Sequence, residues 1–173
     1  IRGDYMRKFL ILILHLFMVC LLIGCDQDTT AITDITTNTQ VIVFGDDSYV
    51  VNDFVNASIS VVEETITPSG LTVEFTYDGE NQGQYGSWYT LLVYSEEQWS
   101  LYPTYGYSGD NEIYWNAMAY LVPVGEAIQE EIDWFWLYGS LTAGRYCIIK
   151  EFTDFRGTGD FTKYYLSQEF TIS

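Results

Sequence analysis

The sequence predicts an all-β domain built as an antiparallel sandwich, and three observations lead to that prediction. Strand-favouring residues are abundant, with 15 Tyr, 10 Phe and 5 Trp among 173 residues. From residue 57 onward, apolar and polar residues alternate in short runs separated by Gly, Pro, Asp and Ser. No helical periodicity persists after Cys25.

The alternating runs indicate each strand in turn. The alternation is clearest at Leu71, Val73, Phe75 and Tyr77, which predicts one buried and one solvated face. Val41–Phe44 is compatible with a strand before this series. We expect the other strands at Ser58–Ile66, Leu71–Tyr77, Trp88–Ser95, Trp99–Tyr102, Ile113–Val122, Ala127–Tyr138, Arg145–Phe152 and Thr162–Ile172. We expect loops at Asp78–Gly86, Thr104–Asp110 and Thr153–Phe161.

Strands spaced about 8–15 residues apart need two facing sheets to bury their apolar sides. We therefore expect an immunoglobulin-like antiparallel β-sandwich of roughly seven to nine strands over residues 41–173. Trp88, Trp134 and Trp136 are its expected core tryptophans.

A targeting segment precedes this domain. Residues 1–24 form the expected leader, with a start at Met6, a basic Arg7-Lys8 pair and a mostly apolar run at Phe9–Ile23. The run is shorter than the roughly 20 residues that a membrane-spanning helix needs. An export signal is therefore the favoured interpretation.

Leu22, Ile23, Gly24 and Cys25 resemble the bacterial lipobox. The resemblance implies a diacylglyceryl group on the thiol of Cys25 and cleavage just before it, which would anchor the protein to the outer face of the cell membrane. Residues 25–40 would then be a Thr-rich tether with a reach of roughly 20 Å.

Charge excludes some partners. The net charge is -17, and 23 acidic but only four basic residues follow Gly24, a net of -19. Phosphate backbones and anionic lipid headgroups repel such a domain, so we expect no nucleic-acid binding, and membrane attachment requires the covalent anchor. The three cysteines, Cys20, Cys25 and Cys147, give no disulfide framework, and Cys147 is expected to be a small buried residue.

Residues 133–150 resemble a bacterial Ig-like domain family of lipoproteins and membrane-attached proteins, chiefly of Gram-positive bacteria. The resemblance rests on Trp134, Leu137-Tyr138-Gly139-x-Leu141, Gly144-x-Tyr146 and Lys150, and it extends over about residues 57–173, where Tyr85-Gly86 and Trp99 also fit. Cys147 stands where the family usually has Arg. The Leu141-x-x-Gly144-x-Tyr146 pattern also resembles a tyrosine corner, in which the Tyr hydroxyl bonds back to the preceding backbone.

The best candidate for a binding site is an aromatic patch. Several of its rings lie in turn-rich sequence, where exposed rings stack on sugars or peptides, although core and edge packing is the alternative. The patch comprises Trp99, Tyr102, Tyr105, Tyr107, Tyr114 and Trp115, followed by Tyr120.

The sequence offers few residues suited to catalysis or metal binding. The one histidine, His15, lies in the leader, and the neighbouring acids Glu96-Glu97 and Glu130-Glu131 would point to opposite faces of a strand. Asp46, Asp47 and Asp53 lack the spacing of a dedicated Ca²⁺ loop, which favours a solvated turn. No catalytic residue, metal or cofactor is expected.

The sequence therefore predicts a lipid-anchored, extracytoplasmic, non-enzymatic Ig-like domain that mediates protein or cell-envelope interaction. The alternative is a carbohydrate-binding module that uses the aromatic patch. Apart from the membrane, the partner is an unidentified protein or glycan.

Overall fold

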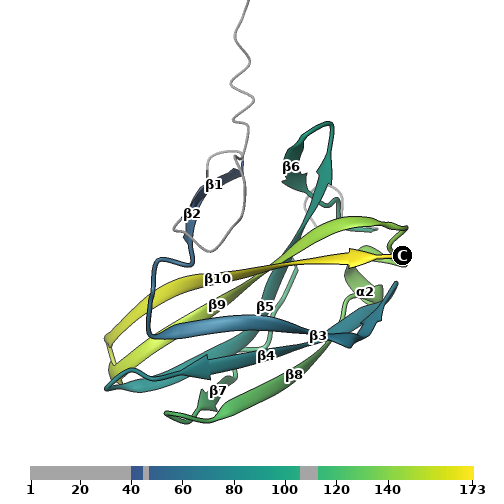
Figure 1. The fold of residues 1–173 in the computed structure, drawn as a ribbon. Coiled ribbons are helices and arrows are strands. Elements are labelled where there is room, and N and C mark those ends of the chain that lie inside the picture. Colours follow the sequence, from purple (N-terminus) through teal and green to yellow (C-terminus); the bar gives the residue numbers. More distant parts are fainter. Residues whose placement is uncertain (1–39, 45–46, 106–112) are drawn as a thin grey trace, which may run out of the picture. The chain divides into compact units, whose positions relative to one another are not determined.

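The computed structural model describes residues 40–44, 47–105 and 113–173, with side chains from residue 50 onward (Figure 1). These residues belong to one compact unit, Ala31–Ser173. The expected leader, the lipobox with Cys25 and the tether lie outside the described residues. No helix in the described ranges is long and apolar enough to cross a membrane.

Two β-sheets face each other, which confirms the predicted all-β sandwich (Figure 1). The larger sheet has the order β1-β2-β10-β9-β5-β6, with β7 also paired to β5, and the smaller has the order β3-β4-β8. The strands of the larger sheet are β1 (Gln40–Phe44), β2 (Asp47–Val51), β5 (Gln82–Ser95), β6 (Gln98–Leu101), β7 (Ala119–Val122), β9 (Gly144–Gly157) and β10 (Asp160–Ile172). Those of the smaller sheet are β3 (Ala57–Thr67), β4 (Gly70–Tyr77) and β8 (Ala127–Asp133).

The pairing is antiparallel except where β2 meets β10 in parallel at Val51 and Tyr165. Asn52 continues this contact from a left-handed backbone conformation, φ 55°. Its backbone N–H donates to the carbonyl of Tyr165, and its side chain amide donates to the hydroxyl of Ser167 at 2.8 Å. The segment before β3 is thereby attached to the larger sheet.

The core lies between the sheets, where the alternating residues meet. Leu71, Val73, Phe75 and Tyr77 all point inward and are buried, as their alternation predicted. Opposite them, β9 contributes inward-facing Tyr146, Ile148 and Phe152, and β10 contributes Leu166, Phe170 and Ile172.

The predicted tyrosine corner is present at the start of β9. The hydroxyl of Tyr146 donates to the carbonyl oxygen of Thr142 at 2.9 Å, while its ring is buried. A Cβ on Gly144 would approach this ring at 3.3 Å, so the glycine gives the ring room. The corner fixes how the chain enters the larger sheet.

Several predicted boundaries were wrong. The predicted loop Asp78–Gly86 contains the start of β5, because Gln82–Tyr85 pair with the far end of β9. The predicted loop Thr153–Phe161 is mostly strand, since β9 continues to Gly157 and β10 begins at Asp160, with Gly159 at φ 78° in the turn between them. Ion pairs from Arg156 to Asp154 and Asp160 stabilise this polar end of the hairpin.

The strand predicted at Ile113–Val122 was too long, because only Ala119–Val122 forms a strand, β7. The predicted strand Ala127–Tyr138 ends at Asp133 and is followed by the helical turn α2 (Phe135–Tyr138). The carboxylate of Asp133 accepts the backbone N–H of Phe135 at 2.8 Å, and Gly139 ends the turn at φ 70°. This local side chain–backbone bond and the glycine end favour a helical turn over a continued strand.

The core tryptophans were predicted only in part. Trp134 is fully buried against Phe170, with its indole N–H donating to the carbonyl of Pro68 at 2.9 Å. Trp136 is 45 % exposed on the other side of α2, so its prediction as a core residue was wrong. Trp88 lies on the outer face of the larger sheet, where it packs against Tyr165.

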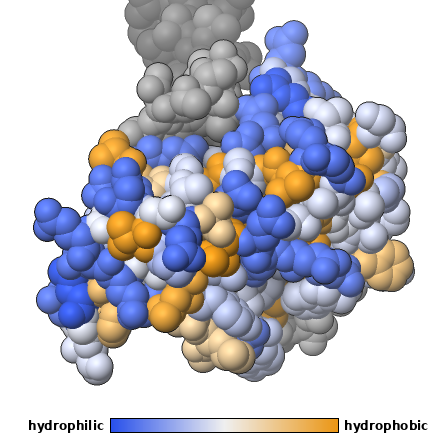
Figure 2. Space-filling model, turned by 60° about the horizontal axis from the view of Figure 1, so that its bottom comes forward, coloured by the Kyte–Doolittle hydropathy of each residue, from blue (hydrophilic) through white to orange (hydrophobic). Residues whose placement is uncertain are grey.

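A second apolar cluster occupies that outer face. Its buried members are Val51, Leu92, Trp99, Cys147 and Ile149. In Figure 2, which brings forward the lower side of the Figure 1 view, hydrophobic side chains are interspersed with hydrophilic ones.

Candidate functional site

The structure separates the predicted aromatic patch into exposed and buried rings. Tyr105 and Tyr114 are largely exposed, at 75 % and 84 %. Trp99 is only 4 % exposed because it packs in the outer-face cluster with Tyr94. Tyr102 is half-buried against the rings of Tyr138 and Tyr146. Tyr107 lies outside the described residues.

The exposed rings gather beside α2. Here a pocket of about 400 Å³ opens between β5, β8, α2 and the segment before β7. Its aromatic walls come from Tyr89, Tyr114, Trp115 and Trp136. Its polar lining comes from Ser87, Asn116, Glu130, Glu131 and Asp133. We refer to it as the α2 pocket.

Trp115 is held at the centre of these rings. Its ring lies 5.0 Å from that of Tyr89 at 66° and 5.6 Å from that of Trp136 at 72°, both edge-on. Tyr120, at the far end of the predicted patch, instead stacks on Tyr85 at 5.3 Å. The α2 pocket thus has steeply inclined aromatic walls and no flat platform.

Hydrogen bonds position these walls. The hydroxyl of Tyr89 donates to the backbone carbonyl of Asp133 at 3.2 Å, which ties β5 to the end of β8. Burial raises the pKa of Tyr89, with Tyr138 and Asp133 adding to the shift and a hydrogen bond from Trp136 opposing it. Tyr105 is attached to α2 through its backbone N–H and the carbonyl of Leu137.

A buried ion pair lies beneath the α2 pocket. Lys150 of β9 and Glu130 of β8 both face inward, so their contact joins the two sheets. The ammonium lies 2.7 Å from Oε2 and 3.0 Å from Oε1 of Glu130, and it donates to the carbonyl of Gly86 at 2.8 Å. Burial lowers the pKa of Lys150 and raises that of Glu130, while the attraction within the pair opposes both shifts.

The remaining carboxylates of the pocket, Glu131 and Asp133, are exposed and lie two residues apart on β8. The four basic residues of the chain after Cys25 all lie in the described ranges, and each is in an ion pair with another carboxylate. Those pairs are Arg145–Glu169, Lys150–Glu130, Arg156–Asp154, Arg156–Asp160 and Lys163–Glu151. No Lys or Arg of the described residues therefore neutralises Glu131 or Asp133.

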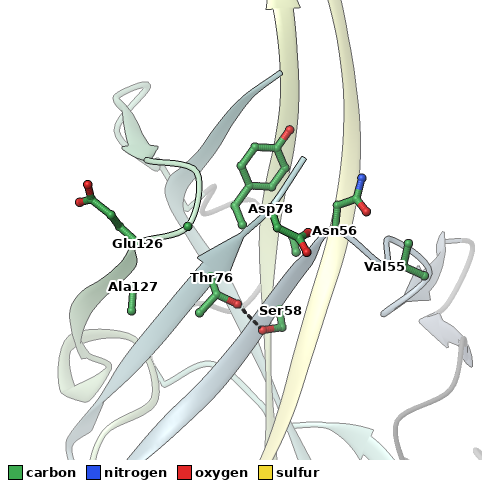
Figure 3. Close-up of a pocket in the computed structure, with 10 residues that line it drawn as sticks. Val55, Asn56, Ser58, Thr76, Asp78, Glu126 and Ala127 are labelled. Atoms are coloured by element: carbon green, nitrogen blue, oxygen red, sulfur yellow. Dashed lines mark hydrogen bonds between the residues drawn. The ribbon is translucent and has the colours of Figure 1, made fainter. Parts of the chain in front are cut away.

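A second pocket, of about 370 Å³, lies where β3 begins and β4 ends (Figure 3). The hydroxyls of Ser58 and Thr76 bond to each other there at 2.7 Å. Its one aromatic ring, Tyr77, directs its hydroxyl to Asp154 at 2.9 Å. This pocket has a single aromatic side chain, whereas four line the α2 pocket, which is therefore the better candidate for a ligand site.

Two other predicted features concern Cys147 and the aspartates. Cys147 is fully buried, and this burial raises the pKa of its thiol to about 12, as suits a packing residue rather than a nucleophile. Asp53 is exposed, whereas Asp46 and the side chain of Asp47 lie outside the described residues. Within the described ranges, no group of His, Cys, Asp and Glu side chains could hold a metal ion.

Sequence reasoning missed Tyr89 and Trp136 as pocket residues. The missed signal is the spacing of Trp134, Leu137 and Tyr138, at positions i, i+3 and i+4. This spacing is that of one buried face of a helical turn. It places Trp136 on the opposite, exposed side.

Comparison with known proteins agrees with this architecture. The family model of the bacterial Ig-like domain matches residues 53–171, which is well over half of the chain and includes β3 to β10. Searches of curated proteins and of solved structures gave no significant match. The two facing sheets, the tyrosine corner and this match together place the chain in the bacterial Ig-like domain family.

Proposed function

We propose that this protein is a lipid-anchored, extracytoplasmic Ig-like domain that acts by binding a protein or envelope component and not by catalysis. Bacterial Ig-like domains are typically surface-exposed interaction modules. The observation that carries the proposal is the α2 pocket, where Tyr114 is 84 % and Trp136 45 % exposed. Rings that the core does not use are typical of binding sites.

The anchoring part rests on the N-terminal segment. An apolar run ending in Leu22-Ile23-Gly24-Cys25 supports acylation at Cys25, and the acidic domain has no attraction of its own to anionic lipids. Cys25→Ser should abolish labelling by a fatty-acid analogue in cells and release the protein from the membrane fraction. Cys20→Ser, a few residues earlier in the leader, is the matched control and should keep both. Labelling and membrane association that survive Cys25→Ser would exclude the anchor.

The binding part is tested on isolated cell envelopes of the host bacterium. Tyr114→Ala and Trp136→Ala should each weaken sedimentation of the purified protein with these envelopes, because they remove exposed walls of the α2 pocket. Phe161→Ala removes a similarly exposed ring near the β9–β10 turn and should have no effect. Equal binding by all three variants and the unmodified protein would exclude the α2 pocket as the binding surface.

The alternative, a carbohydrate-binding module, is favoured by one specific observation. Asn116 and Ser87 line the same pocket as the aromatic rings, and amide and hydroxyl groups next to a ring suit sugar hydroxyls. Quenching of tryptophan fluorescence by cell-wall glycans, lost in Trp136→Ala, is the expected result of this alternative. An unchanged emission spectrum across a glycan panel would exclude it.

A further inference from the structure

The α2 pocket combines inclined aromatic walls with exposed carboxylates that have no cation in the described structure. We propose that it binds the ammonium or guanidinium group of a basic polypeptide. This inference rests on the interaction role proposed above, and it does not depend on the lipid anchor. It names the chemistry of the partner, which neither the family match nor the fold specifies.

The first argument is the geometry of the rings. Sugars stack on the flat face of a ring, whereas organic cations are held where several ring faces converge. Trp115 meets Tyr89 at 66° and Trp136 at 72°, so these rings form walls at steep angles. At these distances the rings touch edge to face, so a ligand reaches them from their exposed sides, chiefly at Trp136 and Tyr114, and the corner between inclined rings suits a compact cation better than a flat sugar ring.

The second argument is charge. Glu131 and Asp133 lie on the same outward side of β8, where they line the rim of the α2 pocket and also a neighbouring hollow beside Thr65 and Thr72. One oxygen of Asp133 accepts the backbone N–H of Phe135, which fixes the position of the carboxylate. Glu130 contributes little free charge because Lys150 neutralises it. Two uncompensated carboxylates thus remain to attract a ligand cation.

The third argument is that the same kind of arrangement already holds a cation inside the domain. The ammonium of Lys150 bonds to Glu130 and lies 5.6 Å from the ring centre of Tyr85 and 6.0 Å from that of Tyr89. Tyr89 also forms part of the α2 pocket, where its ring contacts Trp115. The domain thus already holds one cation between a carboxylate and tyrosine rings, although Tyr89 itself is only 5 % exposed and an external cation would meet its neighbours Trp115 and Trp136 instead.

The net charge of the chain also favours a basic partner. The chain after Gly24 carries a net charge of -19, which accelerates encounter with basic polypeptides and gives no advantage to neutral glycans. Steering of this kind is screened by salt, whereas contact with the rings is screened much less. Binding that persists at physiological salt therefore reports contact with the pocket and not long-range attraction by the net charge of the chain.

The test measures binding to the full chain, purified in a non-ionic detergent, at about 0.15 M salt. The probes are hexalysine, the same peptide with every side-chain amine acetylated, and chitohexaose. We expect hexalysine to bind and acetylation to weaken binding at least about tenfold, because the acetyl groups remove the charges that the carboxylates and rings recognise. Chitohexaose should not bind.

Variants connect the binding to the pocket. Trp136→Ala should weaken hexalysine binding by about five- to tenfold and Glu131→Gln by about two- to fivefold. Phe161→Ala and Glu63→Gln are matched controls elsewhere on the surface and should stay within about twofold of the unmodified protein. Tyr114→Ala provides a second aromatic variant that is safe for folding, since this ring is 84 % exposed.

Three binding results would overturn the proposal, and so would a lack of binding. They are equal binding of the acetylated peptide, equal effects of Glu131→Gln and Glu63→Gln, and binding of chitohexaose without hexalysine, which would assign the pocket to carbohydrate. Absence of binding by all three probes would also overturn it. In that case, envelope sedimentation of the Tyr114 and Trp136 variants decides separately whether the broader interaction role survives.

Discussion

The buried ion pair between Lys150 and Glu130 permits a quantitative test of the packing between the sheets. Lys150 is fully buried, and its ammonium donates to Oε1 of Glu130 and to the carbonyl of Gly86 while it lies 2.7 Å from Oε2 of Glu130. Replacing Glu130 with Gln keeps the shape of the side chain but removes the balancing charge. The variant must therefore keep an unpaired ammonium between the sheets or lose a proton from it.

Both outcomes destabilise the fold. Breaking a buried pair by removing one partner costs about 3–5 kcal/mol. Loss of the proton at pH 7 sets an upper limit of about 4.6 kcal/mol, given an ordinary lysine pKa of about 10.4. The side chain of Glu130 is 18 % exposed, so water reaches the pair from one side. We therefore expect Glu130→Gln to lower the free energy of unfolding by about 3 kcal/mol, near the lower end of that range.

The loss should depend on pH in a defined direction. Burial already lowers the pKa of Lys150, and Glu130 opposes that shift, so its removal lowers the pKa further. Between the folded and unfolded pKa values of this lysine, the unfolded chain binds more protons, and stability therefore rises with pH. The penalty of Glu130→Gln should shrink as the pH is raised from about 7 to about 9.

Urea unfolding followed by far-UV circular dichroism measures both effects. Glu151→Gln is the matched control, because Glu151 pairs at 3.0 Å with Lys163, which is half exposed, and its loss should cost less than about 1 kcal/mol. The double variant Lys150→Met/Glu130→Gln should recover much of the lost stability, since no charge is then left unpaired. A Glu130→Gln penalty no larger than that of the control would refute a buried ion pair, and a penalty independent of pH would contradict the lowered pKa of Lys150.

Three further predictions concern groups elsewhere in the fold. Tyr146→Phe removes the hydroxyl that bonds to Thr142 and should lower the free energy of unfolding by about 1 kcal/mol in the same assay. Tyr114→Phe, at an exposed ring, is the control, and equal stability of the two variants would contradict the tyrosine corner. Cys147, whose burial raises its pKa to about 12, should resist alkylation in the folded protein and react once urea unfolds it, as peptide mass spectrometry would show; ready alkylation without urea would contradict its burial. Burial also raises several tyrosine pKa values above 10.0, so the folded state binds more protons above pH 10, and the stability present below that pH is lost as the pH rises further. In a titration above pH 10, tyrosinate absorbance and the circular dichroism of the fold should therefore change together, and ionisation of these tyrosines without unfolding would contradict the prediction. The tyrosines concerned are Tyr77, Tyr85, Tyr89, Tyr102 and Tyr138.

The fold was predictable from the sequence wherever a strand has one buried and one solvated face. Leu71, Val73, Phe75 and Tyr77 alternate with polar residues, and the structure buries all four. The tyrosine corner was predictable because it is local: Tyr146 and its acceptor Thr142 are four positions apart in the chain. In both cases the information lies within one short segment.

Prediction failed where long-range pairing decides the structure. Residues such as Thr153 and Asp154 are polar and typical of a loop, yet they belong to a strand because they pair with Lys163 and Thr162 of β10. Gln82 is likewise polar and lies in β5 because Phe155 is its partner across the sheet. Composition alone does not report a partner that is distant in the sequence.

The candidate site was predicted in part for a related reason. Tyr114 and Trp115 line the α2 pocket, as expected of an exposed patch, but Trp99 is buried on the outer face of the larger sheet. That sheet carries apolar residues on both faces, for example Leu91 inward and Leu92 outward. Alternation therefore does not tell which aromatic residues along β5 and β6 remain free for a ligand.

The helical turn α2 explains why one aromatic run supplies both the core and the site. In a strand, Trp134, Trp136 and Tyr138 would share one face, and both tryptophans would belong to the core, as the sequence led us to expect. In a helical turn, Trp134 and Tyr138 are four residues apart and share the buried face, whereas Trp136 lies opposite. The hydrogen bond from the backbone N–H of Phe135 to Asp133 and the glycine end at Gly139 favour the turn. The exposure of Trp136, and with it the α2 pocket, thus follows from the local geometry that ends β8.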